Sequence, residues 1–224
     1  MSDSPLSLAA HIRRELSIDQ QLALTTAATR LQSEFDGTFG VATIERFLHS
    51  SYDQFAGRAT IANFLPLLAE RFARQRLNAL ARVEGKVSDG KPTVLFLCTH
   101  NAGRSQMALG YFTFLAGENG VAWSGGSEPG NEINPSAVQA MSEVGIDITG
   151  EFPKPWTDEI VRAADVVVTM GCGDACPIFP GKRYENWDLP DPAGQGIDAV
   201  RPIRDDIEER IRRLLADLGI TPTR

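Results

Sequence analysis

Cysteine is scarce in this chain, and no long hydrophobic run occurs in it. Three cysteines among 224 residues are too few, and an odd number, for a secreted domain held together by disulfides. The lack of any run of about 18 apolar residues excludes a membrane-spanning helix. The first residues also lack the basic segment and unbroken apolar stretch of a secretory signal. We therefore expect a cytoplasmic protein with no membrane partner.

The chain also lacks an excess of positive charge. It carries 22 Lys and Arg residues against 29 Asp and Glu residues, a net charge of −7. Acidic and basic residues balance over residues 1–90, so the whole excess lies in residues 91–224. An acidic field does not attract nucleic acid, and we expect no nucleic-acid partner. Any anion site must therefore be built locally, from backbone N–H groups and a few cationic side chains.

The first 85 residues repeat apolar side chains at helical spacing and show no strand-like alternation. The pattern predicts helices over residues 8–16, 18–35, 41–55 and 59–83. Such a series favours a small antiparallel bundle. A polar stretch containing two Gly and one Pro, residues 84–92, is typical of a domain boundary. We therefore predict an N-terminal helical bundle over residues 1–86.

From residue 91 the pattern changes to short apolar runs separated by helical stretches. Val94–Leu97 is an apolar run of the kind that forms a buried parallel strand. The remaining runs predict strands over residues 121–124 and 166–169, and helices over residues 107–115, 135–144, 158–164 and 203–218. Alternating strands and helices predict an α/β domain with a parallel sheet over residues 91–224.

The segment Cys98–Ser105 carries the strongest chemical signal. Cys98 ends a predicted strand, Arg104 follows six positions later, and a predicted helix starts after it. Loop N–H groups and a helix N-terminus would converge there, which favours a thiolate nucleophile at Cys98. Arg104 can hold a tetrahedral oxyanion through two parallel hydrogen bonds, and Ser105 can hydrogen-bond the sulfur. The alternatives are that Cys98 only fills a core, or that His100 pairs with it; the flanking strand and helix favour the nucleophile.

This segment resembles the signature loop of low-molecular-weight protein tyrosine phosphatases and of the arsenate reductases that share their fold. The resemblance covers residues 91–224 and implies a four-stranded parallel sheet flanked by helices. It places the active site at the carboxyl edge of the sheet, and Asn101 matches the asparagine that shapes the family's loop. It also implies the set of oxyanion-binding residues, namely Thr99, His100, Asn101, Ala102, Gly103 and Arg104.

An aspartate in the C-terminal part of the chain distinguishes phosphatases from arsenate reductases only in part. Asp191 lies in the stretch Asp188–Gly196 and fits the position of the phosphatases' general acid. Phosphatases of this family usually carry tyrosines just after this aspartate, which line a pocket for a phosphotyrosine ring. Here only small residues follow, and a pocket without an aromatic wall suits a small oxyanion better.

Cys172 and Cys176 are the second feature that distinguishes an arsenate reductase from a phosphatase. They follow the strand predicted over residues 166–169, in a segment that also holds Gly171 and Gly173. Parallel strands end on one side of the sheet, so this segment can approach Cys98. Arsenate reductases of this fold resemble this arrangement. A zinc site with His100 and a pair of unrelated buried thiols are the alternatives; one Cys-x3-Cys is a poor zinc signature.

The resemblance therefore implies an arsenate reductase acting in arsenic detoxification. Cys98 would attack arsenate, with Arg104, Ser105 and Asp191 assisting, and a Cys98–Cys172–Cys176 disulfide relay would follow. Every step is thiol exchange, so we expect no metal and no bound cofactor. NADPH would supply electrons through thioredoxin reductase and thioredoxin, or a low-molecular-weight thiol and a redoxin would. The alternatives are a protein tyrosine phosphatase or other small phosphomonoesterase using Cys98, Arg104 and Asp191, and a non-catalytic redox or arsenic sensor.

Overall fold

The computed structural model describes residues 16–56, 64–171 and 178–223. The chain divides into two compact units, Met1–Asn78 and Ala79–Arg224. The division falls inside a helix, α4 (Leu65–Val83), and the polar stretch predicted as a linker begins where this helix ends. The two units are described separately below.

The N-terminal unit is helical, as the apolar spacing predicts. It contains α2 (Ile18–Glu34), α3 (Val41–Ala56) and the first part of α4. Ser17 and Gln20 start α2 with a capping box, in which each side chain bonds the backbone N–H of the other. Gly37, with φ 70°, provides the left-handed turn after α2. Residues 8–15 of the first predicted helix lie outside the described residues.

Charged and aromatic contacts fix how these helices pack. Arg30 on α2 bonds Glu70 on α4 (Nε–Oε1 3.0 Å), and Glu34 accepts a bond of 2.7 Å from Arg74. The two pairs occur in the same order along both helices, so α2 and α4 run in the same direction. Phe55 of α3 meets Phe72 of α4 edge to face, with ring centroids 5.6 Å apart.

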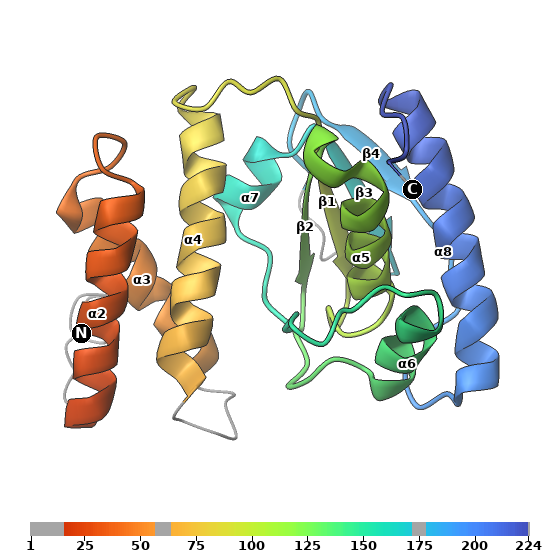
Figure 1. The fold of residues 1–224 in the computed structure, drawn as a ribbon, viewed down its shortest axis with the longest axis horizontal. Helices are drawn as coiled ribbons and strands as arrows, with labels where there is room; N and C mark the ends of the chain where they lie inside the picture. Colours follow the sequence, from red (N-terminus) through yellow and green to blue (C-terminus); the bar gives the residue numbers. More distant parts are fainter. Residues whose placement is uncertain (1–15, 57–63, 172–177, 224) are drawn as a thin grey trace, which may run out of the picture. The chain divides into compact units, whose positions relative to one another are not determined.

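The C-terminal unit contains a four-stranded parallel sheet, which confirms the predicted fold class. Its strands are β1 (Thr93–Cys98), β2 (Val121–Gly126), β3 (Val166–Met170) and β4 (Arg183–Asn186), in the spatial order β2-β1-β3-β4 (Figure 1). Every residue of β1 is buried. This explains why its sequence is a continuous apolar run rather than an alternating one.

Helices cover both faces of this sheet. Three of them, α5 (Arg104–Ala116), α6 (Pro135–Glu143) and α8 (Ile197–Asp217), pack on one face around Val94 and Phe96 (Figure 1). The short α7 (Asp158–Ala163) covers the other face. A single 3-10 turn, Gly117–Asn119, connects α5 to β2. The main core of the unit therefore lies between the sheet and α5, α6 and α8.

One strand and two helix starts differ from the sequence prediction. The sequence does not predict β4, because its edge position leaves a polar, half-exposed sequence without an apolar pattern. The helix α5 begins at Arg104 and not at Met107, because its first three residues are polar yet buried. The helix α8 begins at Ile197 and not at Ile203. It continues through Pro202, which removes one backbone hydrogen bond without ending the helix.

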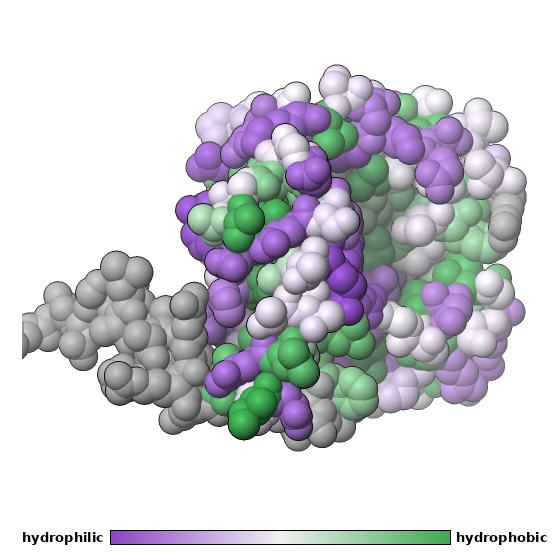
Figure 2. Space-filling view, turned by 60° about the vertical axis from the view of Figure 1, so that its left-hand side comes forward, coloured by the Kyte–Doolittle hydropathy of each residue, from purple (hydrophilic) through white to green (hydrophobic). Residues whose placement is uncertain are grey.

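No helix within the described residues is long and apolar enough to cross a membrane. Hydrophilic and hydrophobic residues are interspersed on the face of the molecule shown in Figure 2. Single exposed apolar residues of this kind are ordinary on a protein surface.

Candidate active site

The sheet topology creates a crevice between β1 and β3. The chain leaves β1 towards β2 on one side and later returns to β3 on the other side. Open α/β sheets bind ligands at such a switch point, outside the carboxyl ends of the strands. Cys98, the last residue of β1, is in register with Met170 at the end of β3. The predicted nucleophile therefore lies at the edge where this fold binds ligands.

Directed hydrogen bonds surround the Cys98 thiol, which is free and buried. The backbone N–H of Lys154 donates to Asn101 Oδ1 (2.9 Å), which leaves Asn101 Nδ2 to donate to Ser105 Oγ (2.9 Å). The hydroxyl proton of Ser105 is then free to point at Cys98 Sγ, 3.0 Å away. Ser105 can therefore donate to the sulfur.

The carbonyl groups of the loop after Cys98 point away from its centre. The carbonyl oxygens of Thr99, His100 and Ala102 each accept a backbone hydrogen bond of 2.9 Å from outside the loop. All peptides of the described residues are trans, so the N–H of the following residue points to the opposite side. Asn101, with φ 47°, lies in the left-handed region and allows this curl. The loop is therefore shaped as an anion-binding nest.

Arg104 connects this loop to the segment that carries Asp191. Its side chain is only 8% exposed, and its Nη2 lies 2.8 Å from Asp191 Oδ2. Its Nη1 donates to the carbonyl oxygen of Leu189 (3.2 Å). Asp191 is half-exposed and also accepts a bond from the backbone N–H of Ala193 (3.0 Å). The structure thus brings together Cys98, Ser105, Arg104 and Asp191.

Gly171, directly after β3, lies against the same guanidinium. A Cβ on this residue would lie 2.8 Å from Arg104 Nη1, and its φ of 76° also favours glycine. Its carbonyl oxygen accepts a bond of 2.9 Å from Thr99 Oγ1. The chain after β3 is therefore tied to the signature loop at Gly171. Cys172 and Cys176 lie outside the described residues.

A small cavity of about 40 Å³ opens between these groups. It is lined by Cys98, His100, Ala102, Gly103, Arg104, Asn134, Asp191, Pro192 and Ala193. None of these described lining residues is aromatic. A small oxyanion therefore suits this cavity better than an aromatic ring does. Trp187, by contrast, is buried against Phe96 in the core.

Two other predicted oxyanion-binding residues, His100 and Gly103, differ in their surroundings. His100 is exposed, and its Nδ1 lies 3.1 Å from the carbonyl oxygen of Glu128. Gly103 packs so closely on Pro192 that a Cβ would lie 2.6 Å from Pro192 Cγ. No cluster of His, Cys, Asp and Glu within the described residues could hold a metal ion.

Sequence reasoning missed three residues that support the site. Asn134 caps α6 and donates from Nδ2 to the carbonyl oxygen of Pro192 (2.9 Å). An asparagine directly before a proline is a known helix-start signal and could have revealed it. Gln106 and Lys154 are fully buried polar residues beside the loop. No local pattern marks either of them.

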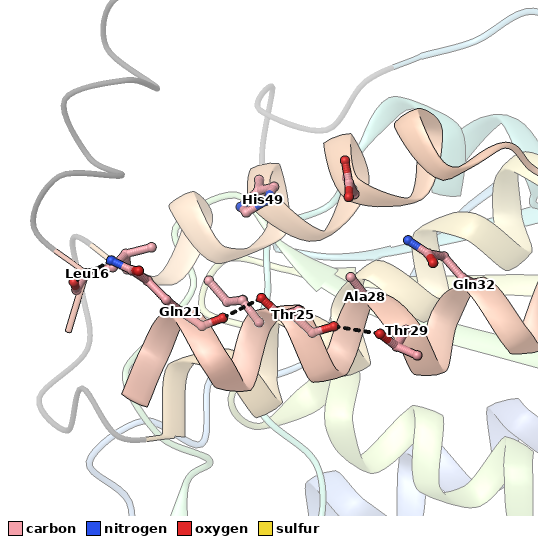
Figure 3. Close-up of a pocket in the computed structure, with 9 residues that line it drawn as sticks. Leu16, Gln21, Thr25, Ala28, Thr29, Gln32 and His49 are labelled. Carbon is pink, nitrogen blue, oxygen red and sulfur yellow. Dashed lines mark hydrogen bonds between the residues drawn. The ribbon is translucent and has the colours of Figure 1, made fainter. Parts of the chain in front are cut away.

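A larger cavity, about 560 Å³, lies between α2 and α3 of the N-terminal unit (Figure 3). The hydroxyl groups of Thr25 and Thr29 in its wall donate to carbonyl oxygens of their own helix, those of Gln21 and Thr25. None of the residues predicted for catalysis lines it. Size alone therefore does not identify the reactive site.

Two family models match the chain. Residues 93–221 match the model described as low molecular weight phosphotyrosine protein phosphatase. Residues 24–81 match the model described as the N-terminal domain of protein-tyrosine-phosphatase-like proteins. The first match includes every residue of the candidate site.

Several similar proteins are arsenate reductases. The solved thioredoxin-dependent arsenate reductase of Corynebacterium glutamicum is 44% identical, with a TM-score of 0.79, and the match covers 88% of this chain and 96% of that one. Arsenate reductase 2 of Staphylococcus saprophyticus is 39% identical over 127 residues, 55% of this chain and 95% of that protein. A solved arsenate reductase in the phosphate-binding state is 33% identical, with a TM-score of 0.50, over 57% of this chain and 98% of that one.

Proposed function

The chain belongs to the low-molecular-weight phosphotyrosine protein phosphatase family, and we propose that within it this protein reduces arsenate to arsenite. The observation that carries the proposal is the small cavity that joins Cys98, Arg104 and Asp191 without an aromatic wall. A tetrahedral oxyanion suits that space, whereas a phosphotyrosine ring has no surface to stack on. The similarity to arsenate reductases at 39% and 44% identity supports the same conclusion.

The first step is attack on arsenic by the Cys98 thiolate. The loop N–H groups and Arg104 hold the arsenate oxygens and stabilise the charge that develops on them. Ser105 stabilises the thiolate through its hydrogen bond to the sulfur. Asp191 gives a proton to the departing oxygen, which leaves as water. The product is a Cys98–arsenic thioester in which arsenic is still pentavalent.

The second step is a thiol relay. The Cys172 thiolate attacks Cys98 Sγ, the sulfur–arsenic bond breaks, and its electron pair leaves with arsenic as arsenite. Cys176 then attacks Cys172, which frees Cys98 and leaves a Cys172–Cys176 disulfide. The position of Gly171, the chain neighbour of Cys172, supports this proposal, because Gly171 is bound to Thr99 and lies against Arg104.

An external dithiol must reduce this disulfide for turnover. We assign this role to thioredoxin, with NADPH as the electron source through thioredoxin reductase. The thioredoxin dependence of the C. glutamicum relative supports the assignment. A low-molecular-weight thiol with a redoxin is the alternative donor. No step requires a metal ion or a bound organic cofactor.

Phosphate-ester hydrolysis is a second candidate activity. Asp191 lies beside Arg104, where it can protonate the leaving oxygen of a phosphate ester as well as that of arsenate. Hydrolysis uses Cys98, Arg104 and Asp191 and needs no further thiol. We therefore propose it as a side activity on small esters.

A single-turnover assay tests the reductase proposal without any partner protein. The fully reduced protein, freed of external thiol, is mixed with arsenate, and arsenite and remaining thiols are measured. We expect one arsenite per chain and the loss of two thiols. Cys98→Ser is the control and should release none. Release of no arsenite by the folded wild-type protein would contradict the proposal.

A further inference from the structure

Gln106 is a buried polar residue to which the mechanism above gives no role. It is the third residue of α5, and its side chain is completely buried. Its Nε2 lies within hydrogen-bond distance of the backbone oxygen of Asn101 (3.0 Å), Asn101 Oδ1 (3.2 Å) and the backbone oxygen of Phe152 (3.2 Å). Backbone oxygens accept hydrogen bonds only, so the amide group is oriented with its N–H groups towards them.

These bonds connect the signature loop to a fixed support. The support is the segment Phe152–Lys154, in which the backbone oxygen of Lys154 accepts a bond of 2.9 Å from the N–H of Gly126, at the end of β2. Lys154 also donates its own backbone N–H to Asn101 Oδ1. Gln106 and Lys154 thus hold Asn101 from two sides.

The orientation of Asn101 decides the environment of the nucleophile. Its backbone lies in the left-handed region, which asparagine adopts more readily than most residues with a side chain. Its Nδ2 donates to Ser105 Oγ, and this bond leaves the hydroxyl proton of Ser105 available to Cys98 Sγ, 3.0 Å away. Loss of the bonds from Gln106 would leave Asn101 Oδ1 held by Lys154 alone and would loosen the position of Asn101 Nδ2 against Ser105.

The amide oxygen of the Gln106 side chain is destabilised by its buried position. Its Oε1 is buried and has no hydrogen-bond partner within the described residues. An apolar side chain of similar shape would avoid that penalty, because both Oε1 and Nε2 would be absent. The N–H groups of Gln106 Nε2 must therefore contribute through hydrogen bonds that an apolar residue does not provide.

We propose that Gln106 is a positioning residue, which holds Asn101 so that Ser105 donates its proton to the Cys98 thiolate. The inference rests on the proposed function only in taking Cys98 as the nucleophile. It needs neither arsenate nor the thiol relay, and so it can be tested apart from them.

The test is the pH dependence of Cys98 alkylation. In a Cys172→Ser, Cys176→Ser background, the full chain is treated with iodoacetamide over a range of pH, and modification is quantified by mass. We expect Gln106→Met, which keeps the shape and removes both N–H donors, to move the midpoint to higher pH by at least about half a unit. Single-turnover arsenite release by Gln106→Met with Cys172 and Cys176 intact should slow about threefold at neutral pH, the factor that half a pH unit represents.

Two controls separate positioning from loss of stability. Gln75→Met removes another glutamine with an unpaired buried Oε1, in α4, and should leave the alkylation midpoint unchanged. Adding Gln106→Met to Asn101→Ala should produce no further shift, because the effect passes through Asn101. If Gln106→Met does not fold, Gln106→Ala takes its place. An unchanged midpoint in the folded variant, with only thermal stability reduced, would overturn the proposal.

Discussion

At the scale of single residues, Arg104 has two competing partners. Its guanidinium is bound to the Asp191 carboxylate in the structure, and the same group must bind the oxyanion. In the proposed mechanism, an oxyanion bound at Arg104 therefore competes with Asp191 for the same N–H donors.

Replacement of Asp191 separates binding from chemistry. Asp191→Asn removes the proton donor and also the negative charge beside Arg104. We expect kcat for arsenate reduction to fall by about 10²-fold or more, with KM unchanged or lower. Steady-state kinetics check this, and the exposed Asp188→Asn is the matched control. A rise in KM with no change in kcat would show that Asp191 is not the acid.

Gly171 provides a steric test of the Arg104 position. In Gly171→Ala the new methyl group would lie 2.8 Å from Nη1 and displace the guanidinium. We expect KM for arsenate to rise about tenfold, because displacement weakens a bidentate charge-assisted contact. Gly181→Ala is the control, since Gly181 has a similar φ of 80° and nothing within 4 Å. Equal effects of the two substitutions would show that backbone strain alone is responsible.

At the scale of elements, the apolar pattern of the sequence predicts the segments that pack in a hydrophobic core. It misses polar residues that are buried at the candidate site. It finds β1 because all of its residues face a core. It misses the first turn of α5, where Arg104, Ser105 and Gln106 are buried by the site rather than by apolar packing. The loop was recognisable from Cys98, Arg104 and Ser105 together with the flanking strand and helix. Its support by Lys154 was not, because residues so far apart in sequence meet only in the folded chain.

The packing of α2 on α4 predicts an acid-dependent stability. The hydrogen bond from Arg30, with help from Arg74, holds the pKa of the buried Glu70 below its ordinary value of 4.5. A lowered carboxyl pKa stabilises the folded state above the unfolded pKa, and this contribution is lost as pH falls through the folded pKa. We expect Glu70→Gln to lower the free energy of unfolding by about 1–2 kcal/mol at pH 7, since Arg30 is largely solvated.

Urea unfolding of the wild type and Glu70→Gln at several pH values measures this contribution. The difference between them should shrink as pH falls below about 4.5, the unfolded pKa of glutamate. The more exposed Glu34→Gln should have a smaller effect at pH 7. A difference that does not change with pH would mean that Glu70 stabilises the helices by packing and not by its charge.

At the scale of the whole molecule, Cys98 is the proposed nucleophile of two reactions, arsenate reduction and phosphate-ester hydrolysis. Only the first of them requires additional thiols. Hydrolysis of p-nitrophenyl phosphate needs Cys98, Arg104 and Asp191 but not Cys172 or Cys176. We expect Cys172→Ser and Cys176→Ser to keep this activity within about twofold, and Cys98→Ser to abolish it. Loss of ester hydrolysis in either outer variant would show that these residues maintain the site itself.

In the proposed reaction, electrons reach arsenic through three cysteines of this chain. Arsenate-dependent oxidation of NADPH, in the presence of thioredoxin and thioredoxin reductase, measures this relay. We expect steady turnover by the wild type and loss of turnover in Cys98→Ser, Cys172→Ser and Cys176→Ser alike. Undiminished turnover in Cys172→Ser or Cys176→Ser would contradict it, because the arsenic–sulfur intermediate would then be resolved without that cysteine.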